Sequence, residues 1–160
     1  MRQAAAVFIH GFNSGPDVWE SFRHLLSQDS DISSEYDLRV FPYASSLANV
    51  HGRKRIPDID TLALSLRTFL QVETKGYNRL AIVTHSQGGL IVQRYLEGML
   101  ADGKGNELAR IRRIIMFACP NSGSDFKLQW RKLLGRAWRN PQEVELRPLA
   151  EGVAKAHRRV

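Results

Sequence analysis

The chain has 160 residues, a mass of 18.2 kDa and 43% hydrophobic residues, which suits one globular domain with a hydrophobic core. These values argue against an intrinsically disordered chain and against a collagen-like or coiled-coil fibre. The formal net charge is +7, and the single cysteine, Cys119, excludes an intrachain disulfide framework and a cysteine-rich zinc site.

The N-terminus does not resemble a signal peptide, because its apolar run is short and ends at a polar His-Gly turn. No stretch approaches the roughly 20 apolar residues that a transmembrane helix needs. We therefore expect a cytoplasmic protein without a transmembrane segment.

The positive charge is concentrated toward the C-terminus. Residues 110–160 hold 12 Lys and Arg against 4 Asp and Glu, whereas residues 1–109 hold 11 against 12. Such a basic tail can make a peripheral contact with an anionic membrane, although a solvated helix face is the commoner cause. We do not expect nucleic acid as a partner.

Four short apolar runs have the character of β-strands: residues 4–9, 38–41, 80–84 and 111–118. They are continuous rather than alternating, which is typical of parallel strands covered on both faces. Helical patterns follow the first loop and recur at 62–70 and at 91–100. Asp60 or Thr61 can cap the second of these helices, and Gly103 ends the third. This alternation predicts an α/β fold, a parallel sheet of about four strands with helices on both faces.

After the fourth apolar run, ACPNSGSDF indicates a loop, and an amphipathic helix follows at 130–138. The remaining C-terminal residues have weak helical character. We expect a single domain over residues 1–160, with a core at 4–126 and a basic helical tail at 127–160.

A sharp strand-to-helix turn is indicated at residues 81–89, AIVTHSQGG, which continue as LIVQRYLEGML. Such a turn exposes a serine at its apex as a nucleophile, here Ser86. Because the turn crowds strand against helix, the residues two before and two after the apex must be small. Here they are Thr84 and Gly88, and Gly89 gives further clearance. Thr84 stands where glycine is usual.

A second motif, FIHGFNSGPDVW at residues 8–19, places a His-Gly-Phe loop at the end of the first strand. We expect the N–H groups of Phe12 and Gln87 to point at one spot and form an oxyanion hole, with His10 and Gly11 shaping the loop. Both motifs follow apolar strands at their carboxyl ends, where open α/β sheets bind ligands.

These segments together resemble the α/β-hydrolase superfamily. VFIHGFNSGPDVW is similar to its oxyanion loop, LAIVTHSQGGLIVQRYL to its nucleophile strand, turn and helix, and IRRIIMFACPNSGSDF to the next strand with its loop. That last loop resembles the Thr-Pro-His-x-Gly-Ser loop of lipase-like serine esterases, including the inositol-deacylase and mitochondrial serine esterase branch, with Asn121 in place of the histidine.

The resemblance covers about residues 4–126. It implies a carboxylic ester hydrolase in which Ser86 is the nucleophile and Phe12 and Gln87 form the oxyanion hole. The substrate would be a small-molecule or lipid ester, and neither a metal nor a cofactor is implied.

The catalytic acid and base follow the serine in the chain order of this superfamily. Asp125, after the fourth strand, is the candidate acid, and His157, the only histidine after Ser86, is the candidate base. No strand precedes His157, and the fourth strand would leave an apolar edge unpaired. We therefore expect the N-terminal portion of a longer hydrolase, or a shortened paralogue, that lacks its acid and base.

Three functions are open at this point. The first is an active serine esterase. The second is a truncated, catalytically inactive hydrolase fold that serves as a binding or interaction module. The third is a binder of anionic surfaces that acts through the basic tail.

Overall fold

The computed structural model describes residues 3–45 and 58–119. The described residues belong to one compact unit, Met1–Cys119, and residues 120–160 lie outside the described part of the chain. The sequence predictions for the tail at 127–160 and its helix at 130–138 therefore fall outside the described residues, and the single domain stays a prediction.

Four parallel strands form one sheet in the order β2-β1-β3-β4. The strands are β1 (Ala4–Ile9), β2 (Tyr36–Val40), β3 (Arg79–His85) and β4 (Ile111–Phe117). The predicted parallel sheet is thus confirmed. β4 ends one residue earlier than expected because Ala118 has a φ of 49°, outside the extended region of the backbone.

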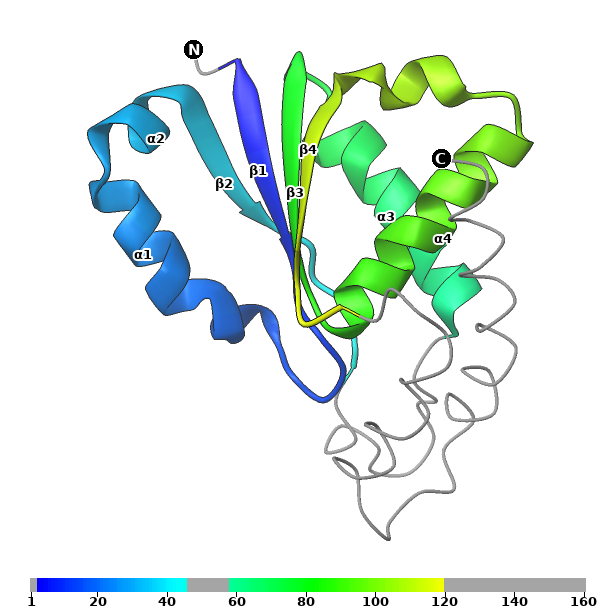
Figure 1. The fold of residues 1–160 in the computed structure, drawn as a ribbon, viewed down its shortest axis with the longest axis horizontal. Helices are drawn as coiled ribbons and strands as arrows, with labels where there is room; N and C mark the ends of the chain where they lie inside the picture. Colours follow the sequence, from blue (N-terminus) through cyan, green and yellow to red (C-terminus); the bar gives the residue numbers. More distant parts are fainter. Residues whose placement is uncertain (1–2, 46–57, 120–160) are drawn as a thin grey trace, which may run out of the picture. The chain divides into compact units, whose positions relative to one another are not determined.

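Helices cover both faces of this sheet, as the sequence predicted (Figure 1). α1 (Glu20–Gln28) and α2 (Ser30–Glu35) lie on one face, and α3 (Ile59–Glu73) and α4 (Gln87–Ala101) lie on the other. Short 3-10 helices at Pro16–Trp19 and Gly105–Arg110 precede α1 and β4. α2 was not predicted from the sequence, because its six residues are mostly polar.

Aspartates cap two of the helices. The Asp29 carboxylate accepts hydrogen bonds from the N–H groups of Asp31 and Ile32 and so starts α2. Asp58 does the same for α3 by accepting from the Thr61 N–H at 2.6 Å. The expected caps, Asp60 and Thr61, are wrong because α3 begins earlier, at Ile59, whose side chain is buried in the core.

The face under α1 is held together by aromatic packing. Trp19 packs against Phe8 of β1, with ring centroids 5.4 Å apart, and against Phe117 of β4, at 6.3 Å. Phe22 of α1 lies 6.1 Å from the Phe117 ring, roughly edge to face. These contacts fix the loop after β1, which carries the His-Gly-Phe motif, relative to the ends of the strands.

β4 is more exposed than its apolar sequence predicts. Ile115, Met116 and Phe117 keep 43%, 38% and 44% of their surfaces accessible. The expectation that this strand is covered on both faces is therefore wrong, because β4 lies at one edge of the four described strands and the helices pack mainly over β1 and β3. Among the described helices, none is both long enough and apolar enough to cross a membrane.

Candidate active site

The two sequence motifs meet because of the register between β1 and β3. Ile9 pairs with Thr84 in the parallel ladder. Two residues further along each chain lie Gly11 and Ser86, at the carboxyl ends of neighbouring strands. β2 and β3 lie on opposite sides of β1, so the direction in which successive strands are added to the sheet reverses at β1. α/β sheets bind ligands at such a reversal.

Ser86 occupies a backbone conformation that favours glycine. Its φ is 52° and its ψ is −119°, and it directly precedes the first residue of α4. The Ser86 N–H donates to the Phe117 carbonyl oxygen at 2.9 Å, and its own carbonyl oxygen accepts from the Gly89 N–H at 3.1 Å. A non-glycine residue in such a region costs about 1–3 kcal/mol and persists only where its surroundings hold it, commonly at active sites.

Two glycines allow the loop after β1 to touch the turn. A Cβ atom added to Gly11 would lie 3.0 Å from the Ser86 Cβ and 2.9 Å from the His85 Nδ1 atom. A Cβ atom added to Gly88 would lie 2.7 Å from the Ile9 carbonyl oxygen and 2.8 Å from that of His10. The His-Gly-Phe loop therefore lies directly against Ser86 and the first turn of α4.

Thr84 is accommodated although glycine is usual at its position. Its side chain is buried, and its hydroxyl oxygen lies 3.4 Å from the Ile115 carbonyl oxygen. The same hydroxyl lies 3.2 Å from the Cys119 Sγ atom. The Thr84 side chain thus points toward the end of β4, where the Ile115 carbonyl oxygen and the Cys119 thiol are polar partners for its hydroxyl.

His10 is buried and holds the shape of the loop. Because a carbonyl oxygen only accepts, its Nδ1 atom must donate to the Gly11 carbonyl oxygen, at 2.9 Å. Its ring stacks on Tyr43 with centroids 4.0 Å apart, and the Tyr43 hydroxyl donates to the His10 carbonyl oxygen at 2.6 Å. Burial lowers the pKa of His10, which favours a neutral imidazole, and raises the pKa of Tyr43.

The other two histidines of the described ranges, His24 and His85, face groups other than the Ser86 hydroxyl. His85 directs a buried Nδ1 atom, which has no hydrogen-bond partner, toward Gly11. His24 is exposed on α1 and contacts Gln28. Within residues 3–45 and 58–119, no histidine is hydrogen-bonded to the Ser86 hydroxyl. The candidate acid and base, Asp125 and His157, lie outside the described residues.

The role of Phe12 and Gln87 as oxyanion donors stays a prediction. Phe12 follows Gly11 in the loop after β1, and Gln87 is the buried first residue of α4. An N-terminal helix end carries a partial positive charge, which favours an anion beside Ser86. No group of three or more His, Cys, Asp and Glu side chains in the described part of the chain is arranged as metal ligands would be.

The contacts that Cys119 and Tyr43 make beside Ser86 and His10 were not predicted from the sequence. Cys119 lies against Thr84 and Gly89, and Tyr43 lies against His10. The signal that could have indicated Cys119 is its position two residues after the end of β4, the strand next to β3. No local pattern marks Tyr43, which reaches the loop from 33 residues away.

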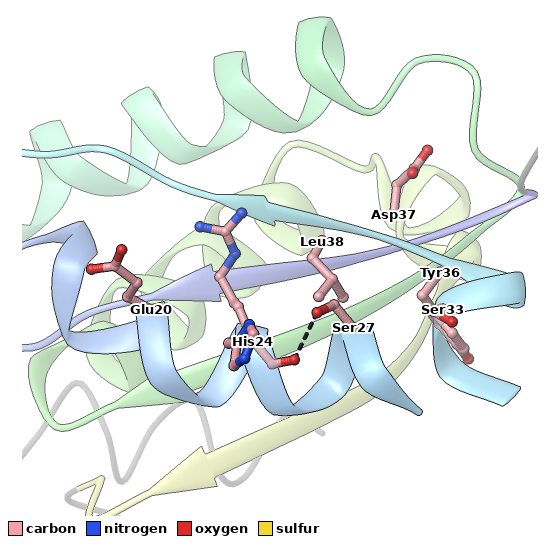
Figure 2. Close-up of a pocket in the computed structure, with 8 residues that line it drawn as sticks. Glu20, His24, Ser27, Ser33, Tyr36, Asp37 and Leu38 are labelled. Atoms are coloured by element: carbon pink, nitrogen blue, oxygen red, sulfur yellow. Dashed lines mark hydrogen bonds between the residues drawn. The ribbon is translucent and has the colours of Figure 1, made fainter. Parts of the chain in front are cut away.

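A groove of about 500 Å³ lies elsewhere on the domain, along α1 (Figure 2). It reaches the first three residues of β2, which lie toward the amino ends of the parallel strands, whereas Ser86 follows the carboxyl end of β3. Its lining residues are Glu20, Arg23, His24, Ser27, Ser33, Tyr36, Asp37 and Leu38. Figure 2 shows Asp37 on the side of β2 away from α1, where its carboxylate accepts from the Tyr77 hydroxyl at 2.6 Å. The groove is therefore not part of the Ser86 site.

Solved structures with similar folds include several lipases. A phospholipase from Legionella pneumophila has a TM-score of 0.68 and 18% identity, over 98% of this chain and 35% of its own. A lipase from Bacillus licheniformis has a TM-score of 0.55 and 21% identity, over 97% of this chain and 58% of its own. A monoacylglycerol lipase from Paleococcus ferrophilus has a TM-score of 0.55 and 16% identity, over 96% of this chain and 67% of its own.

These identities are low, so the structural likeness shows a shared fold, and the chain spans about a third of the length of the phospholipase. No curated protein sequence matches the chain. The sequence profile of the alpha/beta hydrolase family, however, matches residues 6–159. Because this match covers nearly all of the chain and agrees with the sheet, the protein belongs to the alpha/beta hydrolase family.

Proposed function

We propose that Ser86 is the nucleophile of a serine hydrolase that acts on carboxylic esters. The observation that carries this proposal is the conformation of Ser86, with a φ of 52° between a parallel strand and a helix, while the Gly11 backbone lies against its side chain. A serine held in this way stands clear of the backbone at a helix N-terminus, as acyl transfer requires.

In the proposed reaction, the Ser86 hydroxyl oxygen attacks the ester carbonyl carbon while a general base takes its proton. The carbonyl oxygen becomes an oxyanion, which accepts hydrogen bonds from the backbone N–H groups of Phe12 and Gln87. Collapse of this intermediate expels the alcohol and leaves an acyl group on Ser86, which water then removes. His157 is the proposed base and Asp125 the proposed acid.

The proposed substrates are small-molecule or lipid esters. Support comes from the similar solved structures, which include a phospholipase and two lipases, and from the family. The basic tail at 127–160 would favour an anionic lipid surface through its positive charge, and its affinity for anionic vesicles would then fall steeply as salt is raised.

A fluorophosphonate probe tests the proposal, because it reacts only with an activated serine. We expect the chain to be labelled, and Ser86→Ala to abolish the labelling. The same pair of proteins should differ in hydrolysis of a short-chain nitrophenyl ester. Labelling that persists in Ser86→Ala would show that another residue is the nucleophile.

A second candidate function is that of a binding module without turnover. It is favoured by one observation: among the described residues, no histidine is hydrogen-bonded to the Ser86 hydroxyl. In that case the wild-type chain would remain unlabelled and would still bind an ester analogue, with an affinity that Gly11→Val reduces. Loss of labelling in His157→Ala would instead identify the base.

A further inference from the structure

The Thr84 hydroxyl and the Cys119 thiol meet behind the Ser86 turn. Thr84 is buried on β3, and its Oγ1 atom lies 3.2 Å from the Cys119 Sγ atom. Because the thiol hydrogen is directed at the Phe117 carbonyl oxygen, the Thr84 hydroxyl is the donor in this contact. The left-handed conformation of Ala118, with a φ of 49°, ends β4 and turns the chain so that the Cys119 side chain can point back at β3. Two residues 35 positions apart therefore share one contact.

The Cys119 side chain also covers the first turn of α4. A Cβ atom added to Gly89 would lie 2.5 Å from the Sγ atom and 2.8 Å from the Cys119 Cβ atom. The thiol donates to the Phe117 carbonyl oxygen at 3.4 Å. That oxygen also accepts from the Ser86 N–H at 2.9 Å, so the thiol and the backbone of the nucleophile share an acceptor.

The thiol is suited to packing rather than to chemistry of its own. Burial raises the pKa of Cys119, and hydrogen bonds from Thr84 and from the backbone of Gly89 and Ser86 partly oppose that rise. A thiol with a raised pKa holds little of the reactive thiolate near neutral pH. The reaction proposed for Ser86 does not use this group.

We propose that Thr84 and Cys119 are a pair of positioning residues that hold Ser86 and the first turn of α4 in place, and this rests on Ser86 being the nucleophile. In place of a glycine before the turn, the chain has a threonine whose hydroxyl anchors the thiol, and the thiol in turn fills the space beside Gly89. Removing either partner frees the turn to shift relative to the loop that carries Gly11.

Single and double variants test this pair. Thr84→Val removes the hydroxyl at nearly constant volume, and Cys119→Ala removes the sulfur. We expect each to slow fluorophosphonate labelling of Ser86 about tenfold, because sub-ångström misplacement of a reacting group costs rates of this order. The double variant should be little slower than either single variant, since both remove one shared contact. Thr84→Ser and Cys119→Ser, which keep a hydrogen-bonding atom, should recover most of the rate.

Thr68→Val is the matched control for the substitution itself. Thr68 is exposed on α3 and bonds only within its own helix, to the Leu64 carbonyl oxygen. Its replacement should leave labelling of Ser86 unchanged. A similar loss of rate in Thr68→Val would attribute the effect of Thr84→Val to general destabilisation and overturn the proposal.

A second readout does not depend on catalysis. Cys119 is the only cysteine, so a chromogenic disulfide reagent reports on this thiol alone. We expect the pH profile of this reaction to shift to higher pH in Thr84→Val than in the wild type, because the Thr84 hydroxyl no longer donates to the sulfur. An unchanged pH profile would refute the Thr84–Cys119 contact. A shifted profile with unchanged labelling would refute the positioning role. If the wild type is not labelled at all, the proposed nucleophile fails, while the thiol reaction still decides whether the contact exists.

Discussion

Replacement of Gly88 by alanine tests whether the loop after β1 and the first turn of α4 touch as closely as the structure shows. The added Cβ would lie 2.7 Å from the Ile9 carbonyl oxygen and 2.8 Å from that of His10. Ordinary contacts begin at 3.4 Å, so the backbones must separate by about 0.7 Å. Both obstructing atoms belong to the backbone, and rotation of a side chain cannot relieve the clash.

Two opposing effects determine the stability of this variant. Alanine favours a helix over glycine by about 1 kcal/mol. Overpacking against a backbone that must move costs about 1–3 kcal/mol. We therefore expect Gly88→Ala to lose up to about 2 kcal/mol of unfolding free energy. We also expect labelling of Ser86 to slow by tenfold or more, because a shift of about 1 Å can cost a factor of roughly 100 in rate.

Gly98→Ala is the matched control on the same helix. Gly98 is exposed near the end of α4, and nothing lies within 4 Å of an added Cβ. This variant should gain up to about 1 kcal/mol from helix propensity and keep the wild-type labelling rate. Denaturant unfolding and fluorophosphonate kinetics measure the two quantities. If Gly88→Ala matches Gly98→Ala in both, the close approach of the loop to α4 is refuted.

Three further predictions follow from the same geometry. Ser86→Gly should abolish labelling and raise the unfolding free energy by about 1 kcal/mol, because glycine relieves the positive φ; a less stable variant would contradict backbone strain. Trp19→Ala should cost about 3–5 kcal/mol in denaturant unfolding, since it removes the ring packed on Phe8 and Phe117, and a loss below about 1 kcal/mol would contradict this packing. Stability should fall as the pH drops below 6.5, because the unfolded chain binds a proton that buried His10, with its lowered pKa, does not. When the unfolding free energy is measured at about pH 7.5 and about pH 5.5, His10→Asn should reduce this fall.

The sequence predicted those elements whose signals are local. β1 was predicted at its observed bounds, because a continuous apolar run marks a buried strand wherever it lies. α2 was missed because a short polar helix has no apolar stripe, and only the Asp29 cap marks it. The predicted burial of β4 was wrong because coverage depends on where helices pack. Asp125 and His157 lie outside the described residues and stay predictions.

Within the site, the sequence alone determined that Ser86 lies at the apex of a tight strand-to-helix turn. The apolar strand, the small flanking residues and the amphipathic helix are all contained in one continuous segment. Only the tertiary structure decided that Gly11 lies against Ser86 and that Cys119 lies against Thr84 and Gly89. These contacts join segments on different strands. Their distances follow from the hydrogen-bond register of β1, β3 and β4. Continuous apolar runs do not specify this register, because they lack the alternation that distinguishes one register from the next.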